Sequence, residues 1–582
     1  SVNPYYTNSG DIGNFYRIVR ANKKGTNWFQ EIFSPASIQS HNLSISSGGE
    51  RGSHLFSLNY YNQEGTLINT YLKRYSIRAN STYNVSDNVR IGENISFTIR
   101  DNPQIDALTE GSGIGFAFRN QPIIPVYDIM GNYAGSFGSG LGNAKNPVAI
   151  MERTRNNRGV SSRLFGNIFL EIDFLKNFTF RTNFGGQYFS NSFNSFQFPE
   201  YENAENITVN QYNEASATNF NWTWTNTVQY QNSFNDKHNI TVLLGTEAYQ
   251  NKGREVGGST QNYFNFDPNY VNLDTGSGTQ TNYSFQYQDQ LASVFGRLDY
   301  NFSDRYLLSA TIRRDGSSRF LENQYGWFPA VSAGWNISNE NFFPESSWLD
   351  NLKIRGGYGV MGNQLNVDPQ NSFTTFLGNQ QTSYYAIGAT NSSISEGFSR
   401  SRLGNPQAEW EKNINSNIGI DASLFNHTVQ LTVDYYKKTV EDLLYNPNLP
   451  ATIGTATVPY INVGEMKNSG VDIDVSTFFN LTDDLRLNTT LTFTSYDNEI
   501  VKITDELQYF DLEGRRFNGS TIIRNAEGHA VSEFFGYEIE GFWDSTDEIN
   551  QANAAAAAAT GNANATYQND VAVGRFRYRD VN

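Results

Sequence analysis

Apolar and polar residues alternate with a period of two in many segments of the chain. In 75–84, Tyr75 and Ile77 share one face, and Ser76 and Arg78 share the other. Strict alternation of this kind predicts a β-strand with one apolar and one polar face. We count about sixteen such strands of about ten residues, the length that a tilted strand needs to cross a bilayer. The clearest further examples are 89–100, 164–174, 178–189, 292–302, 306–314, 416–425, 427–436, 471–479 and 485–494.

The connections between these strands alternate between short and long. Short polar turns are expected at Ser86–Asn88, Lys176–Asn177, Asn235–Asn239, Ser303–Arg305, Asn426–His427 and Thr482–Asp484. Long irregular segments are expected at about 101–160, 190–220, 252–288, 315–327, 362–410 and 439–467. This layout is typical of outer-membrane barrels, with short periplasmic turns and long extracellular loops. A soluble β-sandwich, propeller or fibre would also show alternation, but it would not predict this succession of loop lengths.

The composition suits a wall with one apolar and one hydrated face. Aromatic residues make up 14% of the 582 residues, and charged residues make up 17%, below the ~25% usual in soluble domains. Mean hydropathy is −0.53, so the chain as a whole is polar. Strand-end aromatics fit an interfacial belt or ordinary cross-strand packing. The examples are Tyr60–Tyr61, Tyr306 and Tyr435–Tyr436.

Charge and residue usage exclude several classes of protein. The net charge of −16 argues against nucleic-acid binding, which requires clustered Lys and Arg. The absence of cysteine excludes disulfides and thiolate metal sites. No apolar run reaches about 18 residues, so a membrane-spanning form of this chain is expected to be a closed, all-β antiparallel barrel. The alanine run 554–559 could be a short helix in a loop or a flexible spacer, and a loop is favoured. Ser1 is interpreted as a start inside a longer protein.

No catalytic, cofactor-binding or metal-binding residue is predicted, and we expect no enzyme. The five histidines are not spaced as metal ligands; they are His41, His54, His238, His427 and His529. Of these, His238 and His427 are expected to be solvated turn residues. Asp472 and Asp474 share one strand face and are interpreted as a polar pair facing the barrel lumen.

Four loop and strand-end features have more than one reading. Gly138–Gly142 lacks a following helix pattern, so a phosphate site is not expected. Asp267–Gly278 is a plain polar loop or a weak Ca²⁺ site. Charged residues at one strand end form a loop-holding ion network or a solvated strand end; they are Arg313, Arg314, Asp315 and Arg319. Trp222 and Trp224 share a face, for which lipid is favoured over lumen.

Several segments, in order, resemble the SusC/RagA family of TonB-dependent transporters of Bacteroidota outer membranes. The most specific is DRYLLSATIRRDGSSRF, residues 304–320. The other matching segments are 62–78, 326–343, 352–364 (LKIRGGYGVMGNQ), 405–444, 462–475 (NVGEMKNSGVDIDV), 533–543 (EFFGYEIEGFW) and 574–582 (GRFRYRDVN).

The resemblance implies a 22-stranded barrel filled by an N-terminal plug, of which about sixteen strands are covered here. Residues 1–36 then form the plug-to-barrel entrance, and 37–582 form a partial barrel without the last strands. The expected function is active import of an oligosaccharide or peptide across the outer membrane. The implied partners are a SusD-like surface lipoprotein, TonB–ExbB–ExbD through the missing plug, and outer-membrane lipid. A passive porin and a non-transport surface protein such as an adhesin are the alternatives, and the substrate-contacting residues are unknown.

Overall fold

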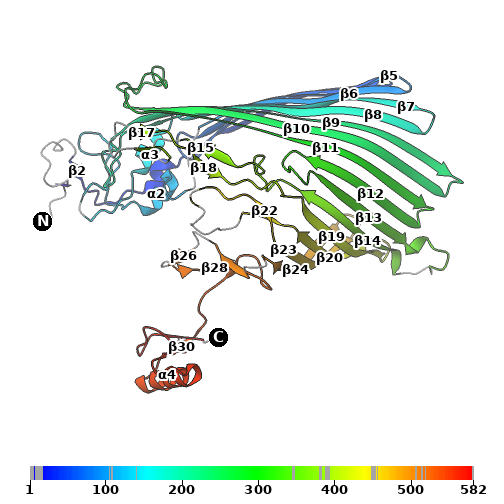
Figure 1. Ribbon diagram of the computed structural model, residues 1–582. Coiled ribbons are helices and arrows are strands. Elements are labelled where there is room, and N and C mark those ends of the chain that lie inside the picture. Colours follow the sequence, from blue (N-terminus) through cyan, green and yellow to red (C-terminus); the bar gives the residue numbers. More distant parts are fainter. Residues whose placement is uncertain are drawn as a thin grey trace. The chain divides into compact units, whose positions relative to one another are not determined.

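The computed structural model consists mainly of long β-strands (Figure 1). It describes residues 5–6, 18–103, 105, 109–138, 140–343, 348–378, 383–386, 394–446, 454, 456–504, 508–512, 516–517 and 520–579. The last residues of the GRFRYRDVN segment, 580–582, and part of the expected 1–36 segment lie outside this set. Within the described ranges, no helix combines the length and the apolarity needed to cross a membrane.

Sixteen strands form one antiparallel sheet, in which they follow one another in chain order, with the shorter strands β15–β18 (within 375–402) and β21–β22 (within 444–462) left out of it. The expected fold class and strand number are therefore confirmed. The strands are β3 (Ile38–Gly49), β4 (Gly52–Glu64), β5 (Tyr71–Ser86), β6 (Val89–Asn102), β7 (Arg158–Phe174), β8 (Phe178–Gln197), β9 (Gln211–Phe234), β10 (His238–Gln261), β11 (Gln280–Phe302), β12 (Tyr306–Ser317), β13 (Tyr325–Asn336), β14 (Leu349–Asn363), β19 (Glu411–Leu424), β20 (Val429–Glu441), β23 (Glu465–Asn480) and β24 (Arg486–Lys502).

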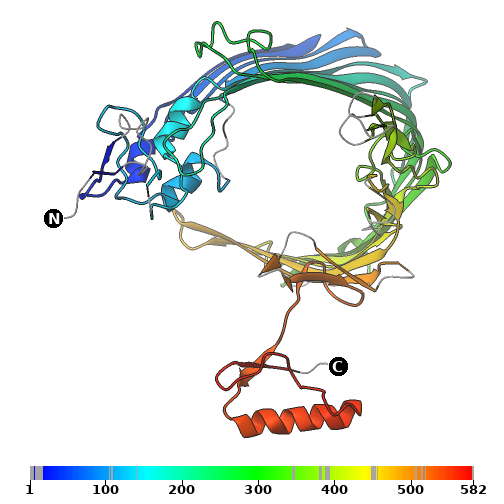
Figure 2. The ribbon, with the colours of Figure 1, turned by 60° about the vertical axis from the view of Figure 1, so that its left-hand side comes forward.

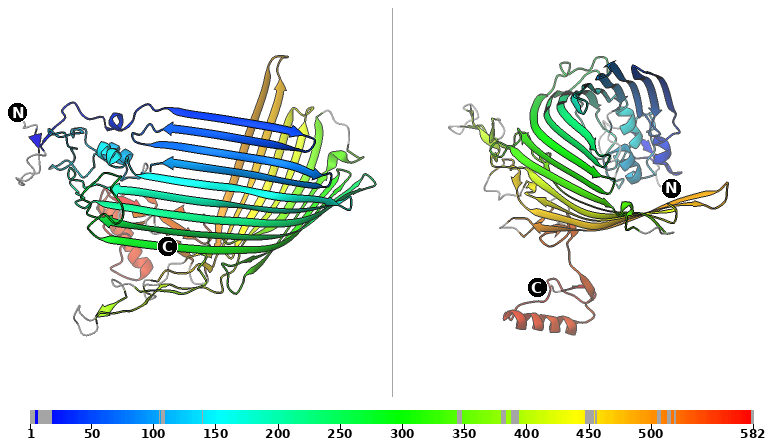
Figure 3. Two further views of the ribbon diagram at one scale, coloured as in Figure 1. Left: turned by 90° about the horizontal axis from the view of Figure 1, so that it is seen from above. Right: turned by 90° about the vertical axis from the view of Figure 1, so that its right-hand side faces the viewer.

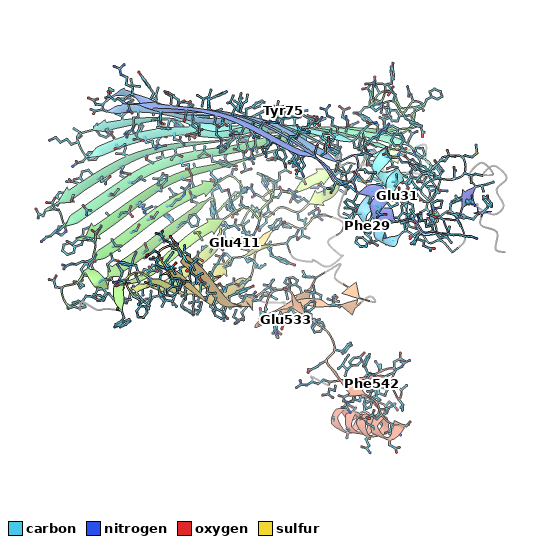
Figure 4. The ribbon with its side chains drawn as sticks, turned by 180° about the vertical axis from the view of Figure 1, so that it is seen from behind. Phe29, Glu31, Tyr75, Glu411, Glu533 and Phe542 are labelled. Atoms are coloured by element: carbon cyan, nitrogen blue, oxygen red, sulfur yellow. The ribbon has the colours of Figure 1, made fainter. Side chains whose placement is uncertain are left out.

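The register separates an apolar face of the sheet from a polar face. On the apolar face, Leu58 of β4 pairs with Ile77 of β5, and Ile77 pairs with Phe97 of β6. The apolar rows stay exposed, with Ile77 at 44%. A sheet with an exposed apolar face and a polar opposite face can contact lipid on one side and water on the other. Figure 4 shows side chains leaving the strands, and its labelled Tyr75 belongs to the apolar face, where it packs against Tyr60.

Consecutive strand residues point to opposite faces, which corrects our reading of the strand-end tyrosine pairs. Tyr60 lies on the apolar face, but Tyr61 lies on the polar face and donates a hydrogen bond to Gln63 at 2.7 Å. Tyr61 therefore cannot belong to a lipid-facing aromatic belt together with Tyr60.

Several of the short turns, although not the one at Ser86–Asn88, close hairpins with left-handed backbone at their central residues. In the β9–β10 turn, Asn235 and Asp236 both have φ of 50°. Two residues with positive φ give the twist that matches right-twisted strands, and Asn and Asp tolerate this conformation better than most residues. His238 is the first residue of β10 and not a turn residue, and its ring lies 4.9 Å from that of Phe302. The expectation of a solvated turn histidine is wrong at this position.

The strands are longer than the expected ten residues, so several expected loops are shorter. β9 and β10 each have 24 residues, and β12 has 12. Most of the expected loop residues in 190–220 and 252–288 are strand. Here the polar residues continue the backbone pairing, as between Ser259 and Thr281, although apolar alternation has stopped. Backbone hydrogen bonding between strands thus extends each strand beyond the residues that show apolar–polar alternation.

The chain divides into two compact units, which we describe separately. Unit 1 comprises Ser1–Pro329 with Val367–Phe373, and unit 2 comprises Ala330–Asn366 with Thr374–Asn582. In unit 1, β3–β11 lie side by side as a curved wall (Figures 2 and 3). A helical cluster in unit 1 contains α1 (Trp28–Ile32), α2 (Gly113–Arg119) and α3 (Pro147–Arg153).

These three helices belong to the main apolar core of unit 1. Ile32, Ile124 and Met151 are at most 1% exposed in this core. The expected irregular segment 101–160 thus contains two helices, which were not predicted. Their seven-residue lengths are too short to show a helical apolar period. The proposed boundary between residues 36 and 37 stays a prediction, although described residues on both sides of it share this core.

The alanine run forms a helix, α4 (Thr546–Thr560), and not the loop that we favoured. Alanine has the highest helix propensity, Ser545 accepts a hydrogen bond from Glu548 N, and Gly561 takes a left-handed φ of 66° after the last turn. Unit 2 also contains the 3₁₀ helix η2 (Ile337–Asn339). The remaining short strands are β1 (Tyr5–Tyr6), β2 (Val19–Arg20), β15 (Thr375–Leu377), β16 (Tyr385–Ala386), β17 (Ile394–Ser395), β18 (Ser399–Arg402), β21 (Leu444–Tyr445), β22 (Ile461–Asn462), β25 (Tyr509–Asp511), β26 (Arg516–Phe517), β27 (Ser520–Thr521), β28 (Ile523–Ala526), β29 (Glu533–Phe534), β30 (Ile539–Phe542) and β31 (Phe576–Tyr578).

Candidate functional site

The polar face of the sheet carries the charged side chains that are candidates for function. In unit 1, Arg313 of β12 donates to Glu247 Oε1 of β10 at 2.8 Å and to Asp315 Oδ1 at 2.7 Å. The same guanidinium donates to Ser293 Oγ of β11 at 2.8 Å. One arginine thus connects three neighbouring strands, which agrees with the ion network, one of the two readings of this strand end.

Arg319 extends this network to a loop. Its guanidinium lies 3.4 Å from Asp289 Oδ1 and donates to the carbonyl oxygen of Val367, while Ser372 Oγ donates to the Arg319 carbonyl at 3.1 Å. Asp289 is buried, and the Arg319 side chain is 11% exposed. These contacts hold the segment Val367–Phe373 against β11 and β12. Of the two readings for the RRDGSSRF segment, the loop-holding network is the one that the contacts support.

Arg314 does not belong to that network. It lies on the opposite, apolar face, where its guanidinium stands 4.1 Å from the ring centroid of Tyr325 and 5.6 Å from that of Trp327. Alternation along β12 requires this split between Arg313 and Arg314. Trp222 and Trp224 also lie on the apolar face, in the row of Val228 on β9. Their indole nitrogens donate to Gln250 and Thr182 of the neighbouring strands.

Unit 2 has a second ion network on its polar face, centred on Arg355 of β14. Arg355 Nη1 and Nη2 each donate at 2.7 Å to one carboxylate oxygen of Asp434 on β20. Arg355 Nε donates to Asp421 Oδ2 of β19 at 2.9 Å. One cation therefore meets two carboxylates through charge-assisted bonds, and the pair with Asp434 is bidentate.

The carboxylate of Glu411 holds loops at the start of β19. The residue is 4% exposed, and Figure 4 labels it. It accepts hydrogen bonds from the side-chain amides of Asn363 at 2.9 Å and Asn366 at 3.3 Å, and from the backbone N–H of Leu444 at 3.2 Å. Asn363 ends β14, whereas Asn366 and Leu444 lie in the connections that follow β14 and β20, so Glu411 fixes where both connections leave the sheet.

A corresponding contact in unit 1 joins α3 to the connection between β8 and β9. Arg153 donates to both oxygens of Glu202, at 2.6 and 3.0 Å, with the rings of Tyr133 and Tyr201 beside its guanidinium. Burial by itself would lower the pKa of Arg153, but the bonds and the charge of Glu202 outweigh that effect and raise it. The connection is therefore held by a cation that stays charged.

One polar region in unit 1 differs from these ion networks, because its arginines have no carboxylate partners. A hollow of about 760 Å³ on β3–β8 has Arg74, Arg78, Arg100 and Arg163 in its wall. The rest of its lining consists mainly of serine, threonine and asparagine, and no described residue of the lining carries a carboxylate. We call this region the arginine hollow. None of these four arginines was a site candidate in the sequence, because only the strand register brings them together.

The other sequence candidates take ordinary structural roles. His238 Nδ1 lies 2.8 Å from the hydroxyl oxygen of Tyr300, and His427 Nδ1 lies 2.7 Å from Ser423 Oγ. Asp474 accepts from Ser476 at 3.2 Å, and Asp472 pairs in register with Asp434 of β20. His41 stacks on Tyr60, His54 lies among the residues around a second hollow on β3–β6, and His529 pairs with Glu533.

The glycine-rich and Asp-rich loops have similarly local contacts. Contrary to expectation, a helix does begin shortly after Gly142, but the side chain of Asn146 already caps α3 at Val148 N and Ala149 N. Asp267 accepts from the backbone and side chain of Asn269 at 3.0 Å. Across the part of the chain that the structure describes, no group of three His, Asp or Glu residues is arranged to hold a metal ion.

Comparison with known proteins gives a consistent result. The model of the family described as TonB dependent receptor-like, beta-barrel, matches residues 100–582. TonB-dependent receptor P26 of Formosa agariphila is 30% identical over 536 residues, which cover 90% of this chain and 52% of that protein. TonB-dependent receptor SusC of Bacteroides thetaiotaomicron is 26% identical over 547 residues, covering 88% and 52%.

A solved structure matches as well. The structure of the RagAB peptide transporter superposes with a TM-score of 0.77 at 25% identity, covering 89% of this chain and 56% of that one. The likeness to SusC and RagA inferred from the sequence segments is thus confirmed. The chain spans about half the length of the relatives that it matches.

Proposed function

Because the chain belongs to the TonB-dependent receptor-like β-barrel family, we propose that it forms the barrel wall of an outer-membrane importer. The observation that carries this proposal is the two-faced sheet of sixteen antiparallel strands. Its apolar face suits lipid, and its polar face suits a hydrated path for a solute. In this role the barrel binds and guides the solute and makes or breaks no covalent bond.

The importer works with other components in this proposal. TonB–ExbB–ExbD supplies energy through a plug that precedes the barrel, and residues 1–36 form the entrance between the two. A SusD-like surface lipoprotein captures the solute above the barrel. The solute is an oligosaccharide or a peptide. Support comes from the likeness to SusC and to the RagAB peptide transporter, together with the held loops around Arg319 and Glu411.

Uptake of labelled solute by whole cells tests the proposal. Cells that carry the complete transporter are compared with cells that lack it, each with and without an uncoupler that removes the proton-motive force. We expect transporter-dependent uptake that stops with the uncoupler. Uptake that continues at full rate would identify a passive porin, and no transporter-dependent uptake of any solute, with the protein still on the surface, would favour an adhesin.

The lipoprotein partner is tested separately. The complete transporter, extracted in mild detergent and purified through a tag, should bring a surface lipoprotein with it in a fixed ratio. A transporter that imports its solute equally well in a strain lacking that lipoprotein would contradict the partner proposal and leave the import proposal intact.

A further inference from the structure

The arginine hollow concentrates positive charge on one part of an otherwise acidic chain. The protein has a net charge of −16, yet four arginines from β5, β6 and β7 face one hollow. Arg74 of β5 and Arg100 of β6 are direct cross-strand partners. Like charges directly opposite each other destabilise a sheet. The fold therefore carries an electrostatic cost at this position that an anion bound in the hollow would remove.

The arginines of the hollow are held by neutral groups and not by carboxylates. Arg163 Nε donates to the amide oxygen of Gln187 at 2.8 Å, and the guanidinium of Arg74 lies 5.1 Å from the ring centroid of Tyr61. Among the residues that the structure describes, Arg78 and Arg100 have no ion-pair partner. Their donors remain available to a ligand.

Glu93 of β6 lies on the apolar face, in register with Ser81. Two further carboxylates of the same strands, Glu171 and Asp101, are engaged elsewhere. On the polar face, Glu171 of β7 accepts from Arg90 and, at 3.2 Å, from Arg181. Asp101 of β6 lies on the opposite face, next in sequence to Arg100, and binds Arg158 through two bonds of 2.7 and 3.0 Å. Neither carboxylate is available to neutralise the hollow.

We infer that the arginine hollow binds an anionic oligosaccharide, one that bears carboxylate or sulfate groups. Arg74 and Arg78 are four residues apart on one strand, so their charges spread over about 13 Å, a span that suits a chain with repeated charges better than one small ion. The hollow also offers the hydroxyl oxygen of Thr98, whose proton is donated to Ser76 Oγ at 3.1 Å, and the amide of Asn59, which can both donate to and accept from sugar hydroxyls. Phe189 provides an apolar surface at its edge.

This inference rests on the proposed import function in one respect: the oligosaccharide that binds in the hollow is taken to be the imported solute. Binding is therefore measured without energy coupling, by titration calorimetry on the complete purified transporter in detergent. The probes are tetragalacturonate, which is anionic, neutral maltotetraose, and hexaglutamate as an acidic peptide. If binding is found but cells import no solute through the transporter, the import proposal fails and the anion site stands.

The test variant is R78Q/R100Q, and R78K/R100K keeps the charge. The matched control is K252Q/R254Q, which removes two positive charges from the apolar face of β10. We expect tetragalacturonate to bind, and its affinity to fall about tenfold or more in R78Q/R100Q, to be mostly retained in R78K/R100K, and to be unchanged in the control. Its affinity should also fall as salt rises, while maltotetraose shows no such dependence.

Three results would overturn the inference. Equal binding of tetragalacturonate and maltotetraose, both insensitive to R78Q/R100Q, would show that the hollow does not select charge. Binding of hexaglutamate in preference to tetragalacturonate would assign the hollow to an acidic peptide. No binding of any probe, with a lower unfolding temperature of R78Q/R100Q than of the control, would assign the arginines to an acidic segment of the same protein. Heat-modifiable mobility on gels checks that each variant is folded.

Discussion

Two polar regions of the protein use arginine in opposite ways. Arg355 in unit 2 is enclosed by Asp421 and Asp434, and every short contact that it makes to them is charge-assisted. The arginines of the hollow in unit 1 face hydroxyls, amides and one another. Both regions lie on the polar face of antiparallel strands, so exposure to the lumen alone does not separate them. The difference is the supply of carboxylates on the neighbouring strands.

That difference separates arginines that hold the wall from arginines that can hold a ligand. Removing a paired arginine leaves carboxylates without a counter-ion and should destabilise the fold. Removing an unpaired one should leave the fold intact and should affect only what binds there. Three arginine substitutions test this distinction, and a substitution of the buried carboxylate Glu411 is ranked with them, from the largest expected effect on stability to the smallest.

Arg355→Ala should cause the largest loss. It leaves Asp421 and Asp434 as close like charges, and we expect the free energy of unfolding to fall by about 2 kcal/mol, between the values for buried and exposed ion pairs. Urea titration of the complete protein in detergent, followed by tryptophan fluorescence, measures the change. Arg254→Ala, on the apolar face of β10, is the control. A loss no larger than that of the control would mean that the network does not hold the wall.

Glu411→Ala should cost about 1–2 kcal/mol locally, because it leaves the buried backbone N–H of Leu444 and the side-chain amides of Asn363 and Asn366 without this acceptor. Chymotrypsin cleavage after Tyr445 reports the release of this region and should become faster. Glu411→Gln keeps one acceptor oxygen and should fall between the wild type and Glu411→Ala. Glu441→Ala, at the end of β20, serves as the matched control. Unchanged cleavage in Glu411→Ala would contradict the assigned role.

Arg319→Ala should release the segment Val367–Phe373 with a smaller effect on the whole protein. Amide hydrogen exchange in this segment should become about tenfold faster, which corresponds to the loss of about 1.4 kcal/mol of local protection. Arg314→Ala removes a neighbouring arginine from the other face and should leave exchange in the segment unchanged. Equal acceleration in both variants would show that the effect is not specific to Arg319.

Arg100→Gln in the arginine hollow should have the smallest effect. It removes one of two like charges that face each other across β5 and β6, so the free energy of unfolding should stay the same or rise by about 0.5 kcal/mol. The urea titration used for Arg355→Ala measures it, and the two variants are compared directly. A loss above about 1 kcal/mol would show that Arg100 has a stabilising partner and would remove the contrast between the two regions.

Sequence patterns predicted the sheet better than they predicted the charged sites. Alternation between Ile77 and its neighbours and the Asn235–Asp236 turn are local signals, and both led to correct elements. The long ends of β9 and β10 were missed because backbone pairing does not require an apolar pattern. The two helices α2 and α3 were missed because they are too short to show a helical period, while α4 was misjudged although its alanines and its cap are local signals.

The charged sites depend on pairings between distant residues. Arg355 meets Asp421 and Asp434 from 66 and 79 positions away in the chain. The RRDGSSRF segment drew attention to Arg313 and Arg319, but it did not reveal that Glu247 and Asp289 would be their partners. No signal in the sequence distinguished Arg78 or Arg100 from the paired arginines.

By itself, then, the sequence determined the two-faced strands, their turns and their antiparallel order, because these follow from side-chain period and turn chemistry within about ten residues. The segments that resemble the SusC/RagA family, which occur in the family's order, also indicated the family. Only the tertiary structure decided which arginines are neutralised and which remain available in a hollow. The physical reason is that charge pairing depends on strand register, which places residues opposite each other that the chain keeps far apart.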